Sequence, residues 1–389
     1  MNYDHYTRRL SCGHEKAITT TKHFAREARN LGVEPSEVLK IWGSRCNIST
    51  LENLHHFSNL KQLTLERNNI EKIHGLEGNQ SLERLGLGEN QIQRIENIDR
   101  CINLQTLSLS KNCITKIEGL ENLGRLKILV LSLNKIQKLE GLDRLENLEQ
   151  LFLYRNQISR IEGLEHLKQL EQLWLSRNQI TKIEGLHQLE NLQVLLLDGN
   201  QVTKIEGLEN LHDLKILELH GNRIKKIEGI SHLKNLEELS IGSRVSRIEG
   251  LEGLTKLRVL NLGGNKIMKI EGLPPNIENL GLSRNQISRI ENLDLLKGLE
   301  YLYLAGNQIS RIENLNFGYI SKLHLRDNKI TKVEGFDELD PEQIEYIDDL
   351  WLDGNPLPQR ILDRLDDDGK VKGNVGEFLE FCKRVQADD

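Results

Sequence analysis

LEQLFLYRNQI, residues 148–158, is the stretch that decides the fold of this chain. Its frame, LxxLxLxxNxI, returns every 22 residues, so one asparagine marks each turn of the pattern. These asparagines are Asn68, Asn90, Asn112, Asn134, Asn156, Asn178, Asn200 and Asn222. A fixed period of roughly 20 to 29 residues with this frame is typical of solenoids whose turns each supply one short parallel strand and one return segment. The pattern therefore predicts stacked repeats over most of the chain.

Stacking explains why the frame has these residue types. Leucine and isoleucine side chains form a continuous core between turns, because one turn alone cannot bury its apolar face. A buried asparagine where the strand ends can satisfy backbone N–H and C=O groups that would otherwise lack partners. We therefore expect an α/β, right-handed leucine-rich repeat solenoid of about 14 turns, with a parallel sheet on the concave side and helical caps at both ends.

The frame does not reach either terminus. The three expected parts are a helical N-terminal cap (1–45), the leucine-rich repeat solenoid (46–357) and a helical C-terminal cap (358–389). Apolar residues at helical spacing over 14–30, and Pro35 opening a second short helix through Trp42, support the first cap. A separate functional arm is the alternative for this segment. Both open ends of a stacked core need such covers.

Three turns in the second half are irregular. The turn that contains Ile241 and Val245 lacks the asparagine and is one residue short. Asn265 and Asn285 are 20 residues apart, and Asn328 and Asn355 are 27 apart. These changes predict a local surface that differs from the regular half, and they are equally compatible with neutral drift of the repeat.

Composition limits the classes of partner. Charged residues make up 28% of the chain but nearly cancel, to a net charge of -6, so no overall field attracts nucleic acid. The sequence has no apolar run that suits a signal peptide or a membrane helix. Five cysteines without paired spacing favour a reducing compartment where thiols stay free. We expect a soluble protein of the cytoplasm, with the nucleus as a further location, that is a monomer when unbound.

Sequence motifs for catalysis are missing. The chain has no GxxxxGK[ST], GxSxG, HExxH or CxxC. Cys12 with His14, and His55 with His56, lack a second pair at metal-ligand spacing. The acidic loop before Gly369 fails as a calcium loop, because Val375 stands where the bidentate glutamate would be. We therefore predict no catalytic residue, no metal, no cofactor and no enzymatic activity.

Charges also follow the repeat. The repeat asparagines are expected to stack from turn to turn as a ladder. A base stands four residues after each ladder asparagine and an acid two residues further on, as Lys182 and Glu184 follow Asn178. Adjacent turns are about 4.8 Å apart, so parallel rows of opposite sign neutralise one another. We interpret the rows as a solvated surface lattice, because exposed ion pairs contribute little to stability. A docking strip is the alternative.

Two columns of side chains should line the concave side of the solenoid. The first column stands between the second and third leucine of the frame, and the companion column two residues later. The first cluster comprises Val130, Phe152, Tyr154, Trp174 and Leu196, with Arg155, Arg177, Asp198, Glu218 and His220 around it. The second cluster comprises Tyr301, Tyr303, His324, Arg326 and Trp351.

These clusters concentrate a scarce residue type. The chain has only 7 Phe, 7 Tyr and 3 Trp, so finding so many on one column indicates selection. Exposed aromatic rings with a charged rim are typical of interface hot spots. Rings that pack only on one another are the alternative.

The repeat resembles a known family in its detail. The turn from Leu164 to Leu186, which ends in KIEGL, is similar to the leucine-rich repeat regulatory subunit of protein phosphatase type one, and the likeness spans roughly residues 46–357. Asn355-Pro356-Leu357 is similar to the start of that family's C-terminal cap.

That resemblance implies a regulatory or targeting subunit of a protein phosphatase. In that family the concave face holds the phosphatase catalytic subunit as the protein partner. The matching positions here are Phe152, Trp174, Asp198, Glu218, Tyr303 and Trp351. The chain departs from the family in its larger number of turns and its irregular second half. The alternative is an internalin-like bacterial adhesin, which shares the 22-residue turn, or another leucine-rich repeat interaction protein.

Overall fold

The computed structural model describes residues 2–4, 9–11, 21–315 and 317–387. Two compact units divide the chain: unit 1, Met1–Asn200, and unit 2, Gln201–Asp389. Residues 14–20 of the expected first helix lie outside the described residues.

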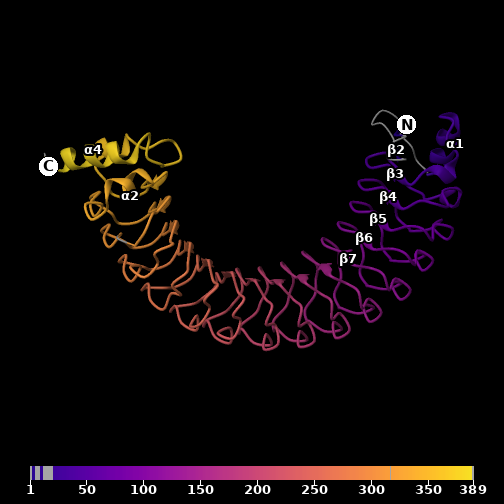
Figure 1. Ribbon diagram of the computed structural model, residues 1–389, viewed down its shortest axis with the longest axis horizontal. Helices are drawn as coiled ribbons and strands as arrows, with labels where there is room; N and C mark the ends of the chain where they lie inside the picture. Colours follow the sequence, from indigo (N-terminus) through magenta and orange to yellow (C-terminus); the bar gives the residue numbers. More distant parts are fainter. Residues whose placement is uncertain (1, 5–8, 12–20, 316, 388–389) are drawn as a thin grey trace. The chain divides into compact units, whose positions relative to one another are not determined.

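Unit 1 is built from three-residue strands joined by turns (Figure 1). They are β1 (Asn2–Asp4), β2 (Arg9–Ser11), β3 (Lys40–Trp42), β4 (Gln62–Thr64), β5 (Arg84–Gly86), β6 (Thr106–Ser108), β7 (Ile128–Val130), β8 (Gln150–Phe152), β9 (Gln172–Trp174) and β10 (Val194–Leu196). The pair β1–β2 is antiparallel, and each following pair is parallel. Its helices are α1 (Lys22–Asn30), η1 (Pro35–Glu37) and η2 (Leu54–His56).

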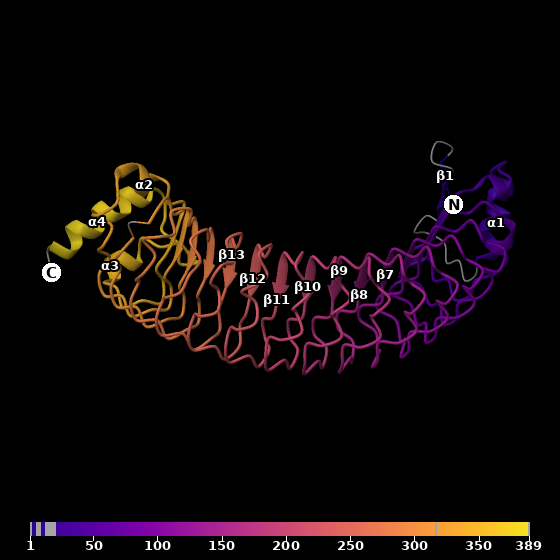
Figure 2. The same ribbon diagram turned by 60° about the horizontal axis from the view of Figure 1, so that its bottom comes forward.

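Register in this sheet follows the repeat without slippage. Equivalent residues pair across each step, so Leu151 lies opposite Leu173, and Phe152 opposite Trp174. Figure 2 shows the arrows of β7 to β10 side by side. Because successive side chains of a strand point to opposite faces, the middle leucines enter the core, and both are fully buried. Their flanking residues form the exposed columns that the sequence predicts.

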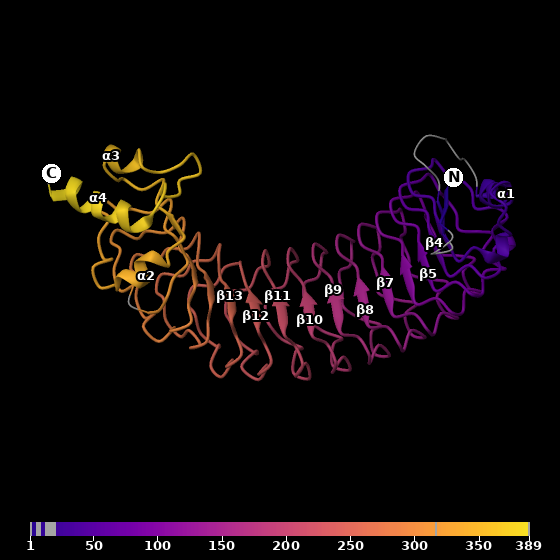
Figure 3. The same ribbon diagram turned by 45° about the horizontal axis from the view of Figure 1, so that its top comes forward.

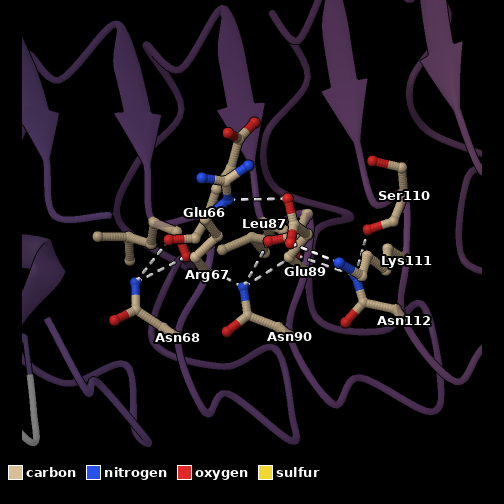
Figure 4. Close-up of polar contacts among 11 residues, drawn as sticks. Glu66, Arg67, Asn68, Leu87, Glu89, Asn90, Ser110, Lys111 and Asn112 are labelled. Atoms are coloured by element: carbon tan, nitrogen blue, oxygen red, sulfur yellow. Dashed lines mark hydrogen bonds and ion pairs between the residues drawn. The ribbon is translucent and has the colours of Figure 1, made fainter. Parts of the chain in front are cut away.

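The asparagine ladder is confirmed. Asn156 Oδ1 accepts a hydrogen bond from the Ile136 N–H at 3.0 Å, and its Nδ2 donates to the Leu131 and Leu153 carbonyls, both at 3.0 Å. Asn156 is buried, so each bond satisfies a backbone group that water cannot reach. Figure 4 shows the same arrangement at Asn90, whose Nδ2 donates to the Leu87 carbonyl. One side chain therefore joins each turn to the preceding one.

Asn156→Ala is expected to lower the free energy of unfolding by about 1 to 3 kcal/mol, because it leaves buried backbone groups without partners. Urea unfolding followed by circular dichroism measures this loss. Lys182→Ala is the control: its ammonium lies 3.9 Å from Glu184 on the exposed surface, and its loss should stay within about 0.5 kcal/mol. An Asn156→Ala curve that overlays the parent would contradict the ladder.

The rows of charge neutralise each other between turns. Arg94 Nε lies 2.9 Å from Glu118 Oε1, and Arg160 Nε lies 3.2 Å from Glu184 Oε1, each a pair from one turn to the next. The arginines of these pairs are largely exposed. These pairs have the geometry that the surface lattice predicts, and exposed pairs contribute little to stability.

The N-terminal segment differs from the expected helical cap, because its strands β1, β2 and β3 belong to the sheet, which therefore starts before residue 46. The second short helix through Trp42 is wrong: η1 ends at Glu37, and Lys40–Trp42 form β3, which pairs in parallel with β4. Ile41 takes the buried leucine position, so β3 is a full member of the sheet. The helix cannot continue past η1, because the backbone of Val38 is already extended, with ψ at 121°.

The expectation that all five thiols stay free is also wrong. Cys46 is disulfide-bonded. Cys101, Cys113 and Cys382 are free. The argument from cysteine usage for a reducing compartment is therefore removed.

Unit 2 repeats the same construction despite its irregular turns. Its strands are β11 (Ile216–Glu218), β12 (Glu238–Ser240), β13 (Val259–Asn261), β14 (Asn279–Gly281), β15 (Tyr301–Tyr303), β16 (Lys322–His324) and β17 (Asp349–Trp351), all parallel and in register. Its helices are α2 (Pro341–Glu345), α3 (Gln359–Leu362) and α4 (Val375–Ala387). The long turn between Asn328 and Asn355 places extra residues in α2, so the strand register is kept.

The last strand of unit 2 has a covered edge. Leu352 N–H donates to the Gly369 carbonyl at 3.2 Å, and Val371 N–H donates to the Leu350 carbonyl at 2.9 Å. Helix α4 then buries Val375, Phe378, Leu379, Cys382 and Val385. Figure 3 shows α4 beside α2 at this end of the unit. These contacts support the C-terminal cap. None of the described helices is both long and apolar enough to cross a membrane.

Candidate protein-interaction surface on the strand faces

Phe152 and Trp174 form the centre of the first cluster in unit 1. They are the last residues of β8 and β9 and lie opposite each other in the parallel register. Their ring centroids are 4.7 Å apart, and the rings meet edge to face at 82°. Trp174 remains 36% exposed, so the pair presents an apolar surface outside the core. Val130 and Leu196 occupy the same column on β7 and β10 and are half-buried.

Tyr154 stands in the companion column beside this pair. Two arginines approach its ring: the guanidinium carbon of Arg155 lies 5.5 Å from the ring centroid, and that of Arg177 lies 5.7 Å away. Such cation–π contacts orient the arginine side chains without neutralising them. Asp198, two turns further along the companion column, is half-buried and adds a carboxylate. Unit 1 therefore brings together an aromatic anchor and charged groups of both signs.

The face of unit 1 changes character towards its N-terminal strands. Thr64, Gly86 and Ser108 continue the first column, and Glu66, Gly88 and Ser110 continue the companion column. Apart from Glu66, these residues are small and offer a partner little side-chain surface. The aromatic cluster is therefore a local feature of β7 to β10.

Sequence reasoning missed Trp42 as a residue of the first column. It ends β3, lies opposite Thr64, and is 40% exposed, with the Arg9 guanidinium carbon 4.0 Å from its ring centroid. The sequence feature that could have identified this strand is Ile41-Trp42-Gly43, in which glycine replaces the third leucine of the frame. A side chain at Gly43 would meet the ring of Phe24 at 2.7 Å, which explains the replacement.

Unit 2 holds the other predicted residues. Glu218 ends β11 and is half-buried, whereas His220 in the companion column is exposed. The His220 ring occupies the space where a side chain at Gly242 would stand, so glycine at the irregular turn makes room for it.

The second cluster lies on β15 to β17. Tyr303 and His324 rings meet at 4.7 Å and 75°, and His324 and Trp351 rings lie 4.9 Å apart. Arg326 lies 5.6 Å from the Trp351 ring and pairs with Asp353 at 2.8 Å. Tyr301 starts β15 and has the Lys322 ammonium 5.9 Å from its ring centroid.

The second cluster is less exposed than the first at its tryptophan. Its members are all half-buried, whereas Trp174 is 36% exposed, and burial lowers the pKa of His324. Lys370 and Lys322 both bind Asp349, which lowers the pKa of that carboxyl group. His324 Nε2 and Trp351 Nε1 are buried without a partner among the described residues. Its charges are mutually satisfied, so the first cluster is the better candidate anchor.

The comparisons agree with this architecture. A family model described as "Leucine Rich repeats (2 copies)" matches residues 80–122, 102–144, 146–186, 190–232, 234–275 and 275–316. A search of curated proteins found no match.

Solved structures share the fold. An internalin (InlF) from Listeria monocytogenes is 27% identical, with a TM-score of 0.67, covering 71% of this chain and 83% of its own. A leucine-rich repeat protein of Leptospira interrogans is 24% identical, with a TM-score of 0.69, covering 91% and 92%. YopM from Yersinia enterocolitica is 21% identical, with a TM-score of 0.60, covering 82% and 72%. Because the family model matches more than half of its residues, the chain belongs to the leucine-rich repeat family.

Proposed function

We propose that this chain is a non-catalytic scaffold that binds a protein partner on the strand face of unit 1. The observation that carries the proposal is the edge-to-face pair of Phe152 and Trp174 on the exposed column. Interface hot spots are enriched in tryptophan, tyrosine and arginine, and this cluster contains all three. The pair lies outside the leucine core, so stacking of the turns does not require it.

The distribution of tryptophan supports the same reading. Trp42, Trp174 and Trp351, the only three in the chain, are each the last residue of a strand and therefore share the first column. Tryptophan supplies a large apolar area at low entropy cost. We infer that the column, rather than the outer surface, is the binding face, with β8 and β9 as its anchor.

Two more specific functions are compatible with this scaffold, and they differ in the partner that is bound. An internalin-like interaction protein is favoured by the likeness to a Listeria monocytogenes internalin at 27% identity. Regulation or targeting of a protein phosphatase rests on the repeat motif and on the acidic and aromatic residues of the column. Regulation of a phosphatase requires an intracellular location, and the disulfide at Cys46 argues against that location. We therefore place the internalin-like function first.

Trp174→Ala combined with Phe152→Ala is expected to weaken partner binding by about 2 kcal/mol or more, roughly 30-fold in Kd. Folding should be nearly unchanged, because both rings stand outside the core. The measurement is affinity purification from the native cell with parent and variant as bait, followed by titration of the recovered partner. Purified catalytic subunit of protein phosphatase type one is titrated in parallel.

The control reverses two bases of the outer lattice, Lys182→Glu and Lys204→Glu. Binding should survive this change if the strand face is the site. Binding that survives loss of both aromatic rings but fails after the charge reversal would move the site to the outer surface. Saturable binding of the phosphatase subunit that is lost with the two rings would put the phosphatase function first.

A further inference from the structure

One column beside the aromatic cluster has an unusual backbone. The residue immediately before each ladder position, which is Cys46 in the first turn and an asparagine in the later turns, has a left-handed conformation throughout unit 1; we call these residues the pre-asparagine column. Its members are Arg45 (φ 60°), Arg67 (58°), Glu89 (55°), Lys111 (56°), Leu133 (60°), Arg155 (54°), Arg177 (54°) and Gly199 (67°). Glycine adopts this conformation without steric cost, whereas other residues do not. Side chains kept at strained positions often serve a function.

In the first half of this column, two bases share one acid. Arg67 Nε lies 2.9 Å from Glu89 Oε1, and Lys111 Nζ lies 2.7 Å from Glu89 Oε2, as Figure 4 shows. The hydrogen bond from Lys111, followed by that from Arg67, lowers the pKa of Glu89. Contacts between turns therefore give Arg67, Glu89 and Lys111 ion-pair partners within the column.

The second half of the column has no such partner. Leu133 is exposed, and neither Arg155 nor Arg177 forms an ion pair with any residue that the structure describes. Both guanidinium groups lie within about 6 Å of the Tyr154 ring centroid, at 5.5 and 5.7 Å. Their central carbons are therefore no more than about 11 Å apart. At Gly199 the column ends, and an added Cβ would lie 3.1 Å from Cγ of Arg177. Glycine therefore leaves that side of Arg177 open.

Arg155 and Arg177 lie beside one ring and have no ion-pair partner among the described residues, so both guanidinium groups are available to an anionic ligand. Arginine binds a carboxylate through two parallel N–H bonds, which gives direction as well as charge complementarity. The apolar pair Phe152 and Trp174 occupies the first column, separated from the pre-asparagine column by the companion column that holds Tyr154. A ligand that satisfies both features carries a large apolar side chain next to a carboxylate.

We propose that Tyr154, Arg155 and Arg177 form an acid-recognising rim of the first cluster, and that the partner presents an acidic segment with an aromatic or large aliphatic anchor residue. The inference rests on the proposed function, because it names the chemistry of the partner at the same surface. Leu133 extends the apolar part of the surface on the other side of Arg155.

The test selects peptides from a phage-displayed library of random 12-residue sequences on the immobilised full chain. Recovered peptides should contain Asp and Glu at roughly three times the frequency of the unselected library, close to an aromatic or large aliphatic residue. Synthetic copies are titrated against Arg155→Gln with Arg177→Gln, and against Arg67→Gln with Lys111→Gln. Both double variants remove two positive charges from one column, so they match in net charge.

Binding should fall by about tenfold or more in the Arg155 and Arg177 variant, and by less than about twofold in the Arg67 and Lys111 control. Peptides without an excess of acidic residues, or equal binding to both variants, would contradict the proposal that this rim recognises acidic groups. Peptides that lose binding with Trp174→Ala but not with the arginine change would leave the scaffold function intact and refute only this inference. A library that shows no enrichment over a blank surface would contradict both.

Discussion

Gly163→Val is expected to lower the free energy of unfolding by about 3 kcal/mol or more. Gly163 has a left-handed φ of 68°, and a Cβ there would lie 2.6 Å from the Leu139 carbonyl oxygen of the preceding turn. A β-branched side chain is strained at this φ and also collides with rigid backbone. Relief would require adjacent turns to separate, which opens the leucine core. Urea unfolding followed by circular dichroism and tryptophan fluorescence measures the loss.

Gly163→Asn separates the two causes. Asn97, Asn292 and Asn314 take the equivalent position with φ of 57° to 59°, and the Asn97 amide donates to the Ile73 carbonyl at 2.7 Å. Asparagine is therefore accommodated where valine is not, and this variant should lose less than about 1 kcal/mol. Gly124→Val is a second control, because nothing lies within 4 Å of a Cβ there. Equal unfolding of all three variants would refute the close approach of the turns.

Removal of residues 358–389 is expected to cause the largest change in unit 2. The segment covers the edge of β17 and buries apolar side chains from Ile361 to Val385. Each such side chain contributes roughly 1.5 to 3 kcal/mol when fully buried, so the last turns should unfold at a lower denaturant concentration. The exposed strand edge and leucines should also promote association. Light scattering after size-exclusion chromatography measures that association.

Removal of residues 386–389 is the matched control, since it keeps Val385 and all earlier buried residues of α4. It should leave both the unfolding midpoint and the molecular mass unchanged. A chain shortened at 357 that stayed monomeric and as stable as the parent would mean that the segment is not a cap. It would then be a candidate for an independent function.

Much of this architecture could be predicted because residues separated by one repeat length are neighbours on adjacent strands. Leu151 and Leu173 are 22 residues apart, and the parallel register places them opposite each other. Phe152 and Trp174 inherit the same placement, so the position of the aromatic pair follows from the repeat alone. The bonds of Asn156 follow from the unmet backbone groups at each bend.

Features that depend on departures from the repeat could not be predicted. Trp42 belongs to a strand because Gly43 leaves space for Phe24, a contact between segments with no fixed spacing. The disulfide at Cys46 likewise has no signature in the repeat frame. The contrast between Glu89, which pairs with two bases, and the unpaired Arg155 and Arg177 requires side-chain geometry as well as column membership.

The asparagine ladder has a consequence for how such a chain can change its length. Ile136 and Ile158 both donate their N–H groups to the asparagine of the following turn at 3.0 Å, so the two boundaries have interchangeable chemistry. Excision or duplication of one whole 22-residue module would rejoin identical partners and leave no orphaned polar group. The free energy of unfolding would change by the contribution of one module. The number of strands between Trp42 and Trp174 would change by one. The number of strands between the exposed residues of the first column can therefore change while the core keeps the same side-chain contacts.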